Sequence, residues 1–147
     1  MGHLHDQVDF TVEVFIVFGS KVLLRKHDKY NMWLSVGGHI EPDEDPNQAA
    51  LREVKEEVGL DVKLDDSLKP PTVDSDNYHE LIPPYFINRH KISDSHEHVT
   101  FTYFAKSETD LLNQTQEGEK SENCQWFTKD ELENLPDLGE DIKYYAQ

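Results

Sequence analysis

The sequence predicts an α+β fold in which helices pack against a mixed β-sheet. Strand-like segments with alternating apolar and polar residues lie on both sides of one strongly signalled helix, at about 46–58. The predicted order is three strands, a helix, a strand, a long loop, three strands and two helices. This order implies a mixed sheet with the helices packed on it.

The first predicted strand is VDFTVEVFIVF at 8–18, which alternates apolar and polar residues over its first half. Phe15 and Val17 make both faces of its second half apolar, so we expect that half to be buried inside the sheet. GSK at 19–21 predicts a tight turn. VLLRKH at 22–27 is then the returning strand of a hairpin.

The helix predicted at 46–58 has signals at both ends. Asp45 is a suitable N-cap, Pro46 suits the first helical position, and Gln48 completes a capping box. Gly59 stands where a C-capping glycine belongs. The helix has two roughly opposite faces, an apolar one with Ala50, Leu51, Val54 and Val58 and an acidic one with Glu53, Glu56 and Glu57. We expect the apolar face to pack on the sheet and the acidic face to point at an opening.

Weaker signals predict the remaining elements. They are a strand at 62–64, a polar loop at 65–80, strands at 81–92 and 98–107, and a terminal helix at 140–146. QWF at 125–127 leads into another helical region. There Thr128 and Glu131 form a capping box, and Phe127 and Leu132 form a hydrophobic staple.

Composition limits the function classes. The 147 residues fit one domain, 1–147, and 14 basic against 30 acidic residues give a net charge of −16. This charge repels nucleic-acid backbones and anionic membranes, so we expect neither a nucleic-acid polymer nor a membrane as partner. It would also repel a small phosphorylated substrate unless a cation stood between them. Acidity alone is more often a solubility feature.

Cysteine use and hydropathy predict the compartment. Cys124 is the only cysteine, which excludes an intrachain disulfide and a thiolate metal cage and fits a reducing compartment. The chain has no run of 18 apolar residues, and MGHLHDQ lacks the pattern of a signal peptide. The sequence therefore predicts a cytoplasmic protein.

Three glutamates, Glu53, Glu56 and Glu57, stand at i, i+3 and i+4 on one side of the predicted helix. Like charges at these spacings destabilise a helix by roughly 0.2–0.5 kcal/mol per pair. A hard cation such as Mg²⁺ takes oxygen ligands and would turn this repulsion into attraction. Three acids on a helix face are, by themselves, more often a solvated surface.

These acids belong to a longer pattern. Gly38 is followed after five residues by Glu44 and after seven more by Arg52, which begins REVKEEVGL. The pattern resembles the Nudix box, G-x5-E-x7-R-E-U-x-E-E-x-G-U with U aliphatic, and every fixed position is filled over 38–60. WLSVGG before the box and WF-x3-EL after it are also similar to the family. The resemblance implies the α/β/α sandwich of the Nudix fold over nearly the whole chain.

The resemblance implies hydrolysis of a nucleoside diphosphate linked to another moiety, with Mg²⁺ as cofactor and Mn²⁺ as a substitute. We expect a nucleoside triphosphate, or a modified one, to give the monophosphate and pyrophosphate. The alternatives are a dinucleoside polyphosphate hydrolase of the Ap4A type and a nucleotide-sensing module without catalysis, although such modules usually lose box acids. Because many relatives dimerise, a homodimer is among the expected assemblies.

Site roles carry over from the family residue by residue. The implied metal ligands are Glu53, Glu56, Glu57, the backbone carbonyl of Gly37 and Glu119. Glu53 either ligates a metal or activates the attacking water. Arg52 is expected to orient neighbouring carboxylates, and Glu44 to hydrogen-bond within the loop. One departure is Val36, where many relatives carry proline before Gly-Gly.

Some relatives supply an additional acid from a later loop. The candidates here are Glu117, Glu119 and Glu122 in QEGEKSENCQW. EKSENCQWF is similar to the ending of some nucleoside triphosphate-hydrolysing Nudix proteins, which favours Glu119. Any of the three is an alternative to Glu53 as the general base.

Substrate-binding residues are less well marked. Tyr78, 18 residues past the box, matches a tyrosine marker of dinucleoside polyphosphate hydrolases. Trp33, Tyr85 and Phe86 are candidates for stacking on a base, although aromatic residues are more often part of a core.

His96 and His98, at i and i+2 on one strand face, have ligand types that suit zinc. The sequence shows no convincing third ligand. They are therefore interpreted as histidines of the surface or of a pocket wall.

Overall fold

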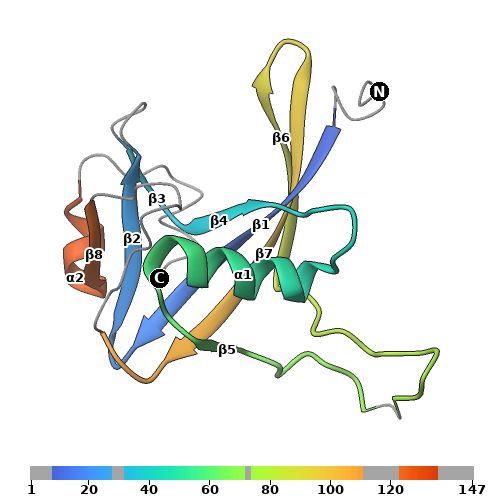
Figure 1. Ribbon diagram of the computed structural model, residues 1–147. Helices are drawn as coiled ribbons and strands as arrows, with labels where there is room; N and C mark the ends of the chain where they lie inside the picture. Colours follow the sequence, from blue (N-terminus) through green and yellow to red (C-terminus); the bar gives the residue numbers. More distant parts are fainter. Residues whose placement is uncertain (1–7, 28–31, 72–73, 111–122, 136–147) are drawn as a thin grey trace.

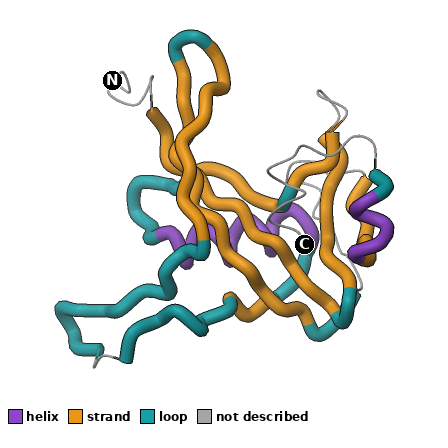
Figure 2. Tube along the Cα trace, turned by 180° about the vertical axis from the view of Figure 1, so that it is seen from behind, coloured by secondary structure: helices purple, strands orange, loops and turns teal. Residues whose placement is uncertain are grey.

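The computed structural model describes residues 8–27, 32–71, 74–110 and 123–135. Within these ranges a mixed eight-stranded sheet carries helix α1 (Pro46–Val58) on one face, and the short helix α2 (Lys129–Glu133) lies beside β8 (Figures 1 and 2). The predicted α+β class is confirmed. The helix expected at 140–146 lies outside the described residues. No helix in the described part of the chain is long and apolar enough to cross a membrane.

The strands are β1 (Val8–Phe18), β2 (Lys21–His27), β3 (Met32–Leu34), β4 (Val36–His39), β5 (Val62–Leu64), β6 (Phe86–Ser93), β7 (His96–Ser107) and β8 (Asn123–Thr128). β1 and β7 run parallel at the centre. β1 pairs with β4 along its first half and with β2 along its second half. The sheet therefore divides into two arms on that side of β1, and Figure 1 shows β2 and β4 diverging.

The hairpin between β1 and β2 follows the sequence prediction within one residue. Phe18 pairs with Lys21, so the loop is the two residues Gly19 and Ser20. Gly19 has a φ of 61°, in the left-handed region that favours glycine.

Both ends of α1 are confirmed as predicted. Asp45 accepts a hydrogen bond from the Gln48 amide at 2.8 Å, and the Gln48 side chain accepts one from the Asp45 amide at 2.9 Å. At the other end Gly59 has a φ of 72°, and its amide donates to the Lys55 carbonyl at 3.0 Å. Caps formed by neighbouring residues thus fix where this helix begins and ends.

The predicted separation of the two faces of α1 is wrong in two places. Leu51, expected on the buried side, is 42% exposed, whereas Glu57, expected on the acidic face, is 2% exposed. Glu57 follows Ala50 by seven residues and Val54 by three, so its side chain projects from the face that packs on the sheet. A charged side chain therefore lies between the helix and the strands.

Two strand boundaries also differ from the prediction. β6 begins at Phe86 and not at 81, because Pro83 and Pro84 have no amide hydrogen to donate to a strand ladder. β7 begins two residues early, at His96. Near the C-terminal end, the predicted capping box of Thr128 and Glu131 is confirmed.

The core has two parts, one on each face of the central strands. Val14 and Ile16 of β1 pack with Val54 of α1 in the larger cluster. Phe15, whose side chain points the other way, packs with Phe127 and Leu132 beside α2. Thr11 and Glu13, in the first half of β1, belong to neither cluster.

Candidate active site

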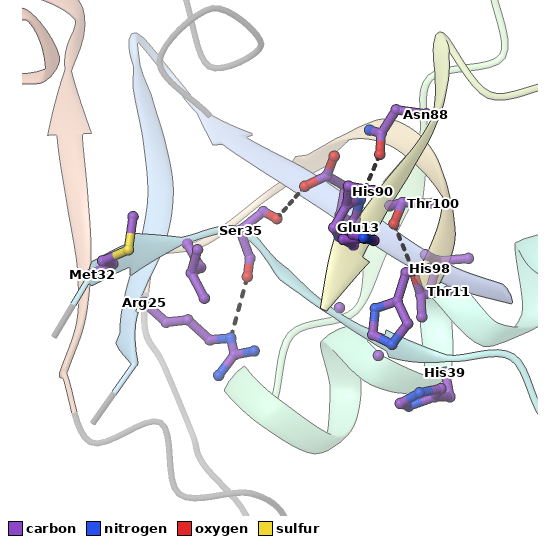
Figure 3. A pocket seen from close by; sticks show the side chains of 15 residues that line it. Thr11, Glu13, Arg25, Met32, Ser35, His39, Asn88, His90, His98 and Thr100 are labelled. Carbon is purple, nitrogen blue, oxygen red and sulfur yellow. Dashed lines mark hydrogen bonds between the residues drawn. The ribbon is translucent and has the colours of Figure 1, made fainter. Parts of the chain in front are cut away.

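A pocket of about 590 Å³ opens over the first half of β1, and strands β2, β3, β4, β6 and β7 also contribute to its lining (Figure 3). The lining includes Thr11 and Glu13 of β1, Arg25 of β2 and the backbone of Gly37 and Gly38. In this half of β1, Thr11 and Glu13 pair with β4 on one edge and with β7 on the other, and β2 leaves β1 in a different direction from β4. The pocket therefore lies over a face of the paired strands, with Arg25 of β2 and residues of β3 at one side of it.

The carboxylate of Glu13, which is partly buried, lies in the lining of the pocket. Glu13 accepts hydrogen bonds from the Ser35 hydroxyl at 2.7 Å and from the Thr102 hydroxyl at 2.6 Å. The Arg25 Nε donates to the Ser35 carbonyl at 3.2 Å, and Figure 3 shows the contacts of Ser35 with Glu13 and with Arg25. Ser35, between β3 and β4, and Thr102 of β7 thus fix the orientation of Glu13.

Glu57 connects α1 to the pocket. Its carboxylate accepts a hydrogen bond from the Gly37 amide at 3.1 Å and lies 3.7 Å from the Arg25 Nε. Gly37 and Arg25 both line the pocket. Arg25 partly compensates the loss of hydration that burial imposes on this carboxylate. Because Glu57 projects toward the sheet, one acid of the box contacts two residues that line the pocket.

Arg52 holds the other box acids together. Its guanidinium donates two hydrogen bonds to Glu44, at 2.7 and 3.1 Å. Nη1 lies 3.1 Å from Glu53 Oε2 and 3.3 Å from Glu56 Oε1, and Nη2 donates to the His39 carbonyl at 3.0 Å. The Glu44 side chain also accepts from the Glu41 amide at 3.0 Å within the loop before α1. One planar cation thus joins the loop, the helix and β4.

The protonation of these acids follows their surroundings. Burial raises the pKa of Glu53 above its usual value, although Arg52 opposes this shift. The hydrogen bonds from Arg52 lower the pKa of Glu44, and the same bonds raise the pKa of Arg52. Two glutamates nine residues apart therefore differ in how readily they take up a proton.

Glu44→Gln is expected to lower the free energy of unfolding by about 1–2 kcal/mol at neutral pH, because it removes a bidentate contact that is only partly exposed to solvent. The pKa of Glu44 lies below its usual value of 4.5, so the stabilisation is fully present above that pH and is lost as the pH falls through the lowered pKa. Denaturant unfolding over a pH series measures this. A difference from the unaltered protein that persists unchanged into acid would contradict the assignment.

The residues present fit a hard divalent cation by their chemistry. Glu53, Glu56 and Glu57 supply carboxylate oxygens, and a single guanidinium nitrogen already places positive charge between the first two. Among the described residues, the group of acids and histidines whose ligand atoms lie within 4.8 Å of one another is a different one, Asp9, His39, His96 and His98. The carboxylates of the box are held by contacts with the side chains of Arg52 and Arg25.

The aromatic residues predicted to stack on a base do not line the pocket. Trp33 is 9% exposed and packs edge-on against Phe127 in the smaller core cluster. Tyr85 donates to Asp65 at 2.6 Å, and Phe86 packs against Phe104.

Tyr78 is 57% exposed, and its hydroxyl donates to Glu80 at 3.0 Å. None of Trp33, Tyr78, Tyr85 and Phe86 is among the described residues that line the pocket. Glu117, Glu119 and Glu122 lie outside the described residues.

Sequence reasoning missed Glu13, Arg25 and Ser35 as pocket residues. The available signal was weak: Asp9, Thr11 and Glu13 are the polar residues of an otherwise apolar central strand, all on the same face. Only the pocket in the folded structure shows that this face is open rather than packed.

Comparison with known proteins identifies the family. A NUDIX domain model matches residues 9–147, and the chain belongs to this family. A hydrolase of the NUDIX family from Clostridium perfringens has a solved structure that is 33% identical, with a TM-score of 0.81, covering 94% of this chain and 93% of that one. The Ap4A hydrolase of C. elegans, solved in a binary complex, is 16% identical with a TM-score of 0.66, covering 94% of this chain and 92% of that one. This likeness supports the fold only.

Curated relatives match over short segments. Dihydroneopterin triphosphate diphosphatase of Escherichia coli K12 is 49% identical over 41 residues, 28% of this chain and 27% of that protein. Diphosphoinositol polyphosphate phosphohydrolase 3-alpha of Mus musculus is 47% identical over 45 residues, 30% of this chain and 27% of that protein. The matched segment thus spans about a quarter of the length of these relatives.

Proposed function

We propose that the chain is a divalent-metal-dependent pyrophosphohydrolase that cleaves a phosphoric anhydride bond of a small nucleotide. The observation that carries this proposal is the connection through Gly37, which lines the pocket and donates its amide to the buried carboxylate of Glu57. It joins the acids of α1 to a pocket whose volume, about 590 Å³, is within the usual range for small-molecule sites. The substrate that we favour is a nucleoside triphosphate, or a modified one, which yields the monophosphate and pyrophosphate.

Each box acid has a role in this proposal. Glu56, Glu57 and the Gly37 carbonyl would hold Mg²⁺, for which Mn²⁺ substitutes. When bound, the ion would offset phosphate charge and act as a Lewis acid. Glu53, whose carboxylate lies 3.1 Å from Nη1 of Arg52, would take the proton of the attacking water. The water oxygen forms the new bond to phosphorus, and the bond to the departing phosphate oxygen breaks.

The pocket also suits a nucleotide by its charge. The chain carries a net charge of −16, yet Arg25 and Lys91 both line the pocket and can face phosphate oxygens. Glu13 supplies a fixed acceptor for the N–H groups of a base. The alternative substrate, a dinucleoside polyphosphate, rests on the tyrosine marker Tyr78. The Tyr78 hydroxyl donates to Glu80, and Tyr78 is not among the described residues that line the pocket, so we favour the triphosphate.

A substrate panel tests the proposal. It comprises nucleoside triphosphates and modified ones, Ap4A, ADP-ribose and nucleotide sugars. It also includes a pterin triphosphate and a diphosphoinositol polyphosphate, which represent the relatives. Reactions with Mg²⁺ or Mn²⁺ in ¹⁸O-labelled water, read by phosphorus NMR, show which bond breaks. Release of monophosphate and pyrophosphate supports the leading candidate. Failure to hydrolyse any member, together with tight calorimetric binding of an intact nucleotide, would favour a sensing module.

Gly38→Ala is expected to lower hydrolysis at least about tenfold with little change in stability. A Cβ on Gly38 would lie 2.2 Å from Glu53 Oε2, and the flexible carboxylate arm must move away. A Cβ on Gly37 would instead lie 2.1 Å from the Val12 carbonyl, in the backbone of β1. Gly37→Ala should therefore destabilise the fold by about 2 kcal/mol. Rates and thermal melts of both variants distinguish these effects, and equal loss of stability would refute the distinction.

A further inference from the structure

A second group of ligand-type side chains lies where β1 and β7 begin and β4 ends. It comprises Asp9 of β1, His39 of β4, and His96 and His98 of β7, and one ligand atom of each lies within 4.8 Å of the others. The strand register brings them together. Asp9 pairs with His98 across the parallel strands, and Thr11 pairs with His39 on the opposite edge of β1. Three strands thus converge their side chains on one point.

The distances match the coordination of a small metal ion. His96 Nε2 lies 3.0 Å from Asp9 Oδ2, and His39 Nε2 lies 3.6 Å from the same oxygen. In a tetrahedral zinc site with bonds of 2.0–2.1 Å, neighbouring ligand atoms stand about 3.3 Å apart. The ring of His98 lies 5.0 Å from that of His96 and 5.1 Å from that of His39, between centroids. Since all four ligand atoms lie within 4.8 Å of one another, side-chain rotations would have to shorten the longest separations by up to about 1.5 Å to enclose one ion.

The chemistry of the group selects its ligand. Three imidazoles and one carboxylate suit zinc and similar transition metals, whereas Mg²⁺ prefers oxygen ligands throughout. The neutral imidazole ring is the form of histidine that binds such a metal. Asp9 and His96 have side chains only 24% and 27% exposed, while His39 is 61% exposed. The ligands are therefore backed by the sheet and reachable from solvent.

A histidine–aspartate ion pair is the simpler explanation to be weighed. Elsewhere in the chain His79 lies 3.9 Å from Asp74, and both are well exposed. A pair of that kind needs one imidazole for one carboxylate. Here one carboxylate faces two imidazoles, and a third imidazole packs against both of them. A cation shared by the three rings would account for their proximity. The extra imidazoles favour a metal over a simple pair.

We propose that Asp9, His39, His96 and His98 form a binding site for Zn²⁺ or a similar transition-metal ion, separate from the acidic residues of α1. His39 directly follows the two glycines of β4, and both His39 and His98 line the pocket, where Figure 3 shows them close together. An ion there ties the end of β4 to β1 and β7. It would also hold the start of the loop that leads to α1 and stand at the rim of the pocket.

Zinc titration of the full chain tests this proposal directly. The background carries His3→Ala and His5→Ala, because imidazoles near the start of the chain also bind zinc. Excess Mg²⁺ occupies sites made of oxygen ligands. Calorimetry is expected to show one tight Zn²⁺ per chain and a raised melting temperature. Co²⁺ in place of zinc should give the visible absorption of a tetrahedral site.

Matched variants separate a built site from adventitious binding. His39→Ala, at the most exposed ligand, and Asp9→Asn are each expected to weaken zinc binding at least about tenfold. His79→Ala should leave it unchanged. Melting curves without metal show that each variant is folded. The proposal is overturned if the background chain binds no zinc, or if His79→Ala weakens binding as much as His39→Ala. Because binding is measured without nucleotide, the result does not depend on the proposed hydrolysis.

Discussion

Replacing Glu57 with glutamine is expected to lower the turnover of nucleotide hydrolysis about 100-fold or more. The substitution keeps the shape of the side chain, and the remaining oxygen can still accept the hydrogen bond from the Gly37 amide. What is lost is the buried negative charge that would hold the divalent cation. A 100-fold decrease corresponds to about 2.7 kcal/mol of transition-state stabilisation, at 1.36 kcal/mol per factor of ten.

The fold of Glu57→Gln should survive. The loss of the contact with Arg25 is offset in part by relief of the repulsion between Glu57 and Glu53, one turn apart, so we expect a change of no more than about 1 kcal/mol. Steady-state rates over a range of Mg²⁺ concentrations, together with denaturant unfolding, provide the measurement. Glu133→Gln makes the same chemical change at an exposed position of α2 and serves as the control. Near-normal turnover in Glu57→Gln would remove this residue from the metal-holding group.

The ends of α1 were predictable because their causes are local. Asp45, Gln48 and Gly59 form caps with residues no more than four positions away, so the sequence contains the complete interaction. The same holds for the turn at Gly19, where a two-residue loop needs a left-handed conformation. Local rules succeed where both partners of a contact are close in the chain.

The buried position of Glu57 was not predictable from such rules. An apolar and polar pattern treats a glutamate as a surface residue, whereas contacts with distant residues, among them Gly37 on β4 and Arg25 on β2, make the burial of Glu57 tolerable. Leu51 shows the reverse case, since an apolar residue of the pattern is left 42% exposed in the described fold. Tertiary contacts decided both positions.

The pocket and the histidine group depend on strand register in the same way. The sequence shows His96 and His98 as a pair but does not show that a parallel pairing of β1 and β7 brings Asp9 beside them. Likewise, aromatic residues such as Trp33 look equally suited to a binding site and to a core. Trp33 packs in the core because β8 places Phe127 against it.

Replacing Arg52 with alanine is expected to lower the free energy of unfolding by about 3 kcal/mol in the absence of divalent cations. The guanidinium makes hydrogen bonds to Glu44, Glu53, Glu56 and the His39 carbonyl, and its removal leaves carboxylates that are only 11% and 13% exposed, those of Glu44 and Glu53, without their cation. Breaking a fully buried pair costs about 3–5 kcal/mol, and the value here is at the lower end because Arg52 itself is 24% exposed. Denaturant unfolding measures the difference.

Lys55→Ala provides the control on the same helix. Lys55 pairs with Asp61, and the two side chains are 57% and 88% exposed, so the expected loss is below about 0.5 kcal/mol. Arg52→Lys should fall between the two, because an ammonium group keeps the charge and loses the planar set of donors. Equal losses in Arg52→Ala and Lys55→Ala would show that the contacts of Arg52 add nothing beyond an ordinary surface pair.

The response of Arg52→Ala to Mg²⁺ joins the stability of the fold to the proposed activity. In the unaltered protein, Nη1 of Arg52 stands between the carboxylates of Glu53 and Glu56, where it neutralises part of their charge. Without that guanidinium, added Mg²⁺ is expected to stabilise the variant more than it stabilises the unaltered protein, since the carboxylates have lost their own cation. Thermal melts over a Mg²⁺ series, with Ca²⁺ for comparison, measure this. If Mg²⁺ raised the melting temperatures of both proteins equally, the acids around Arg52 would not be the residues that bind the ion.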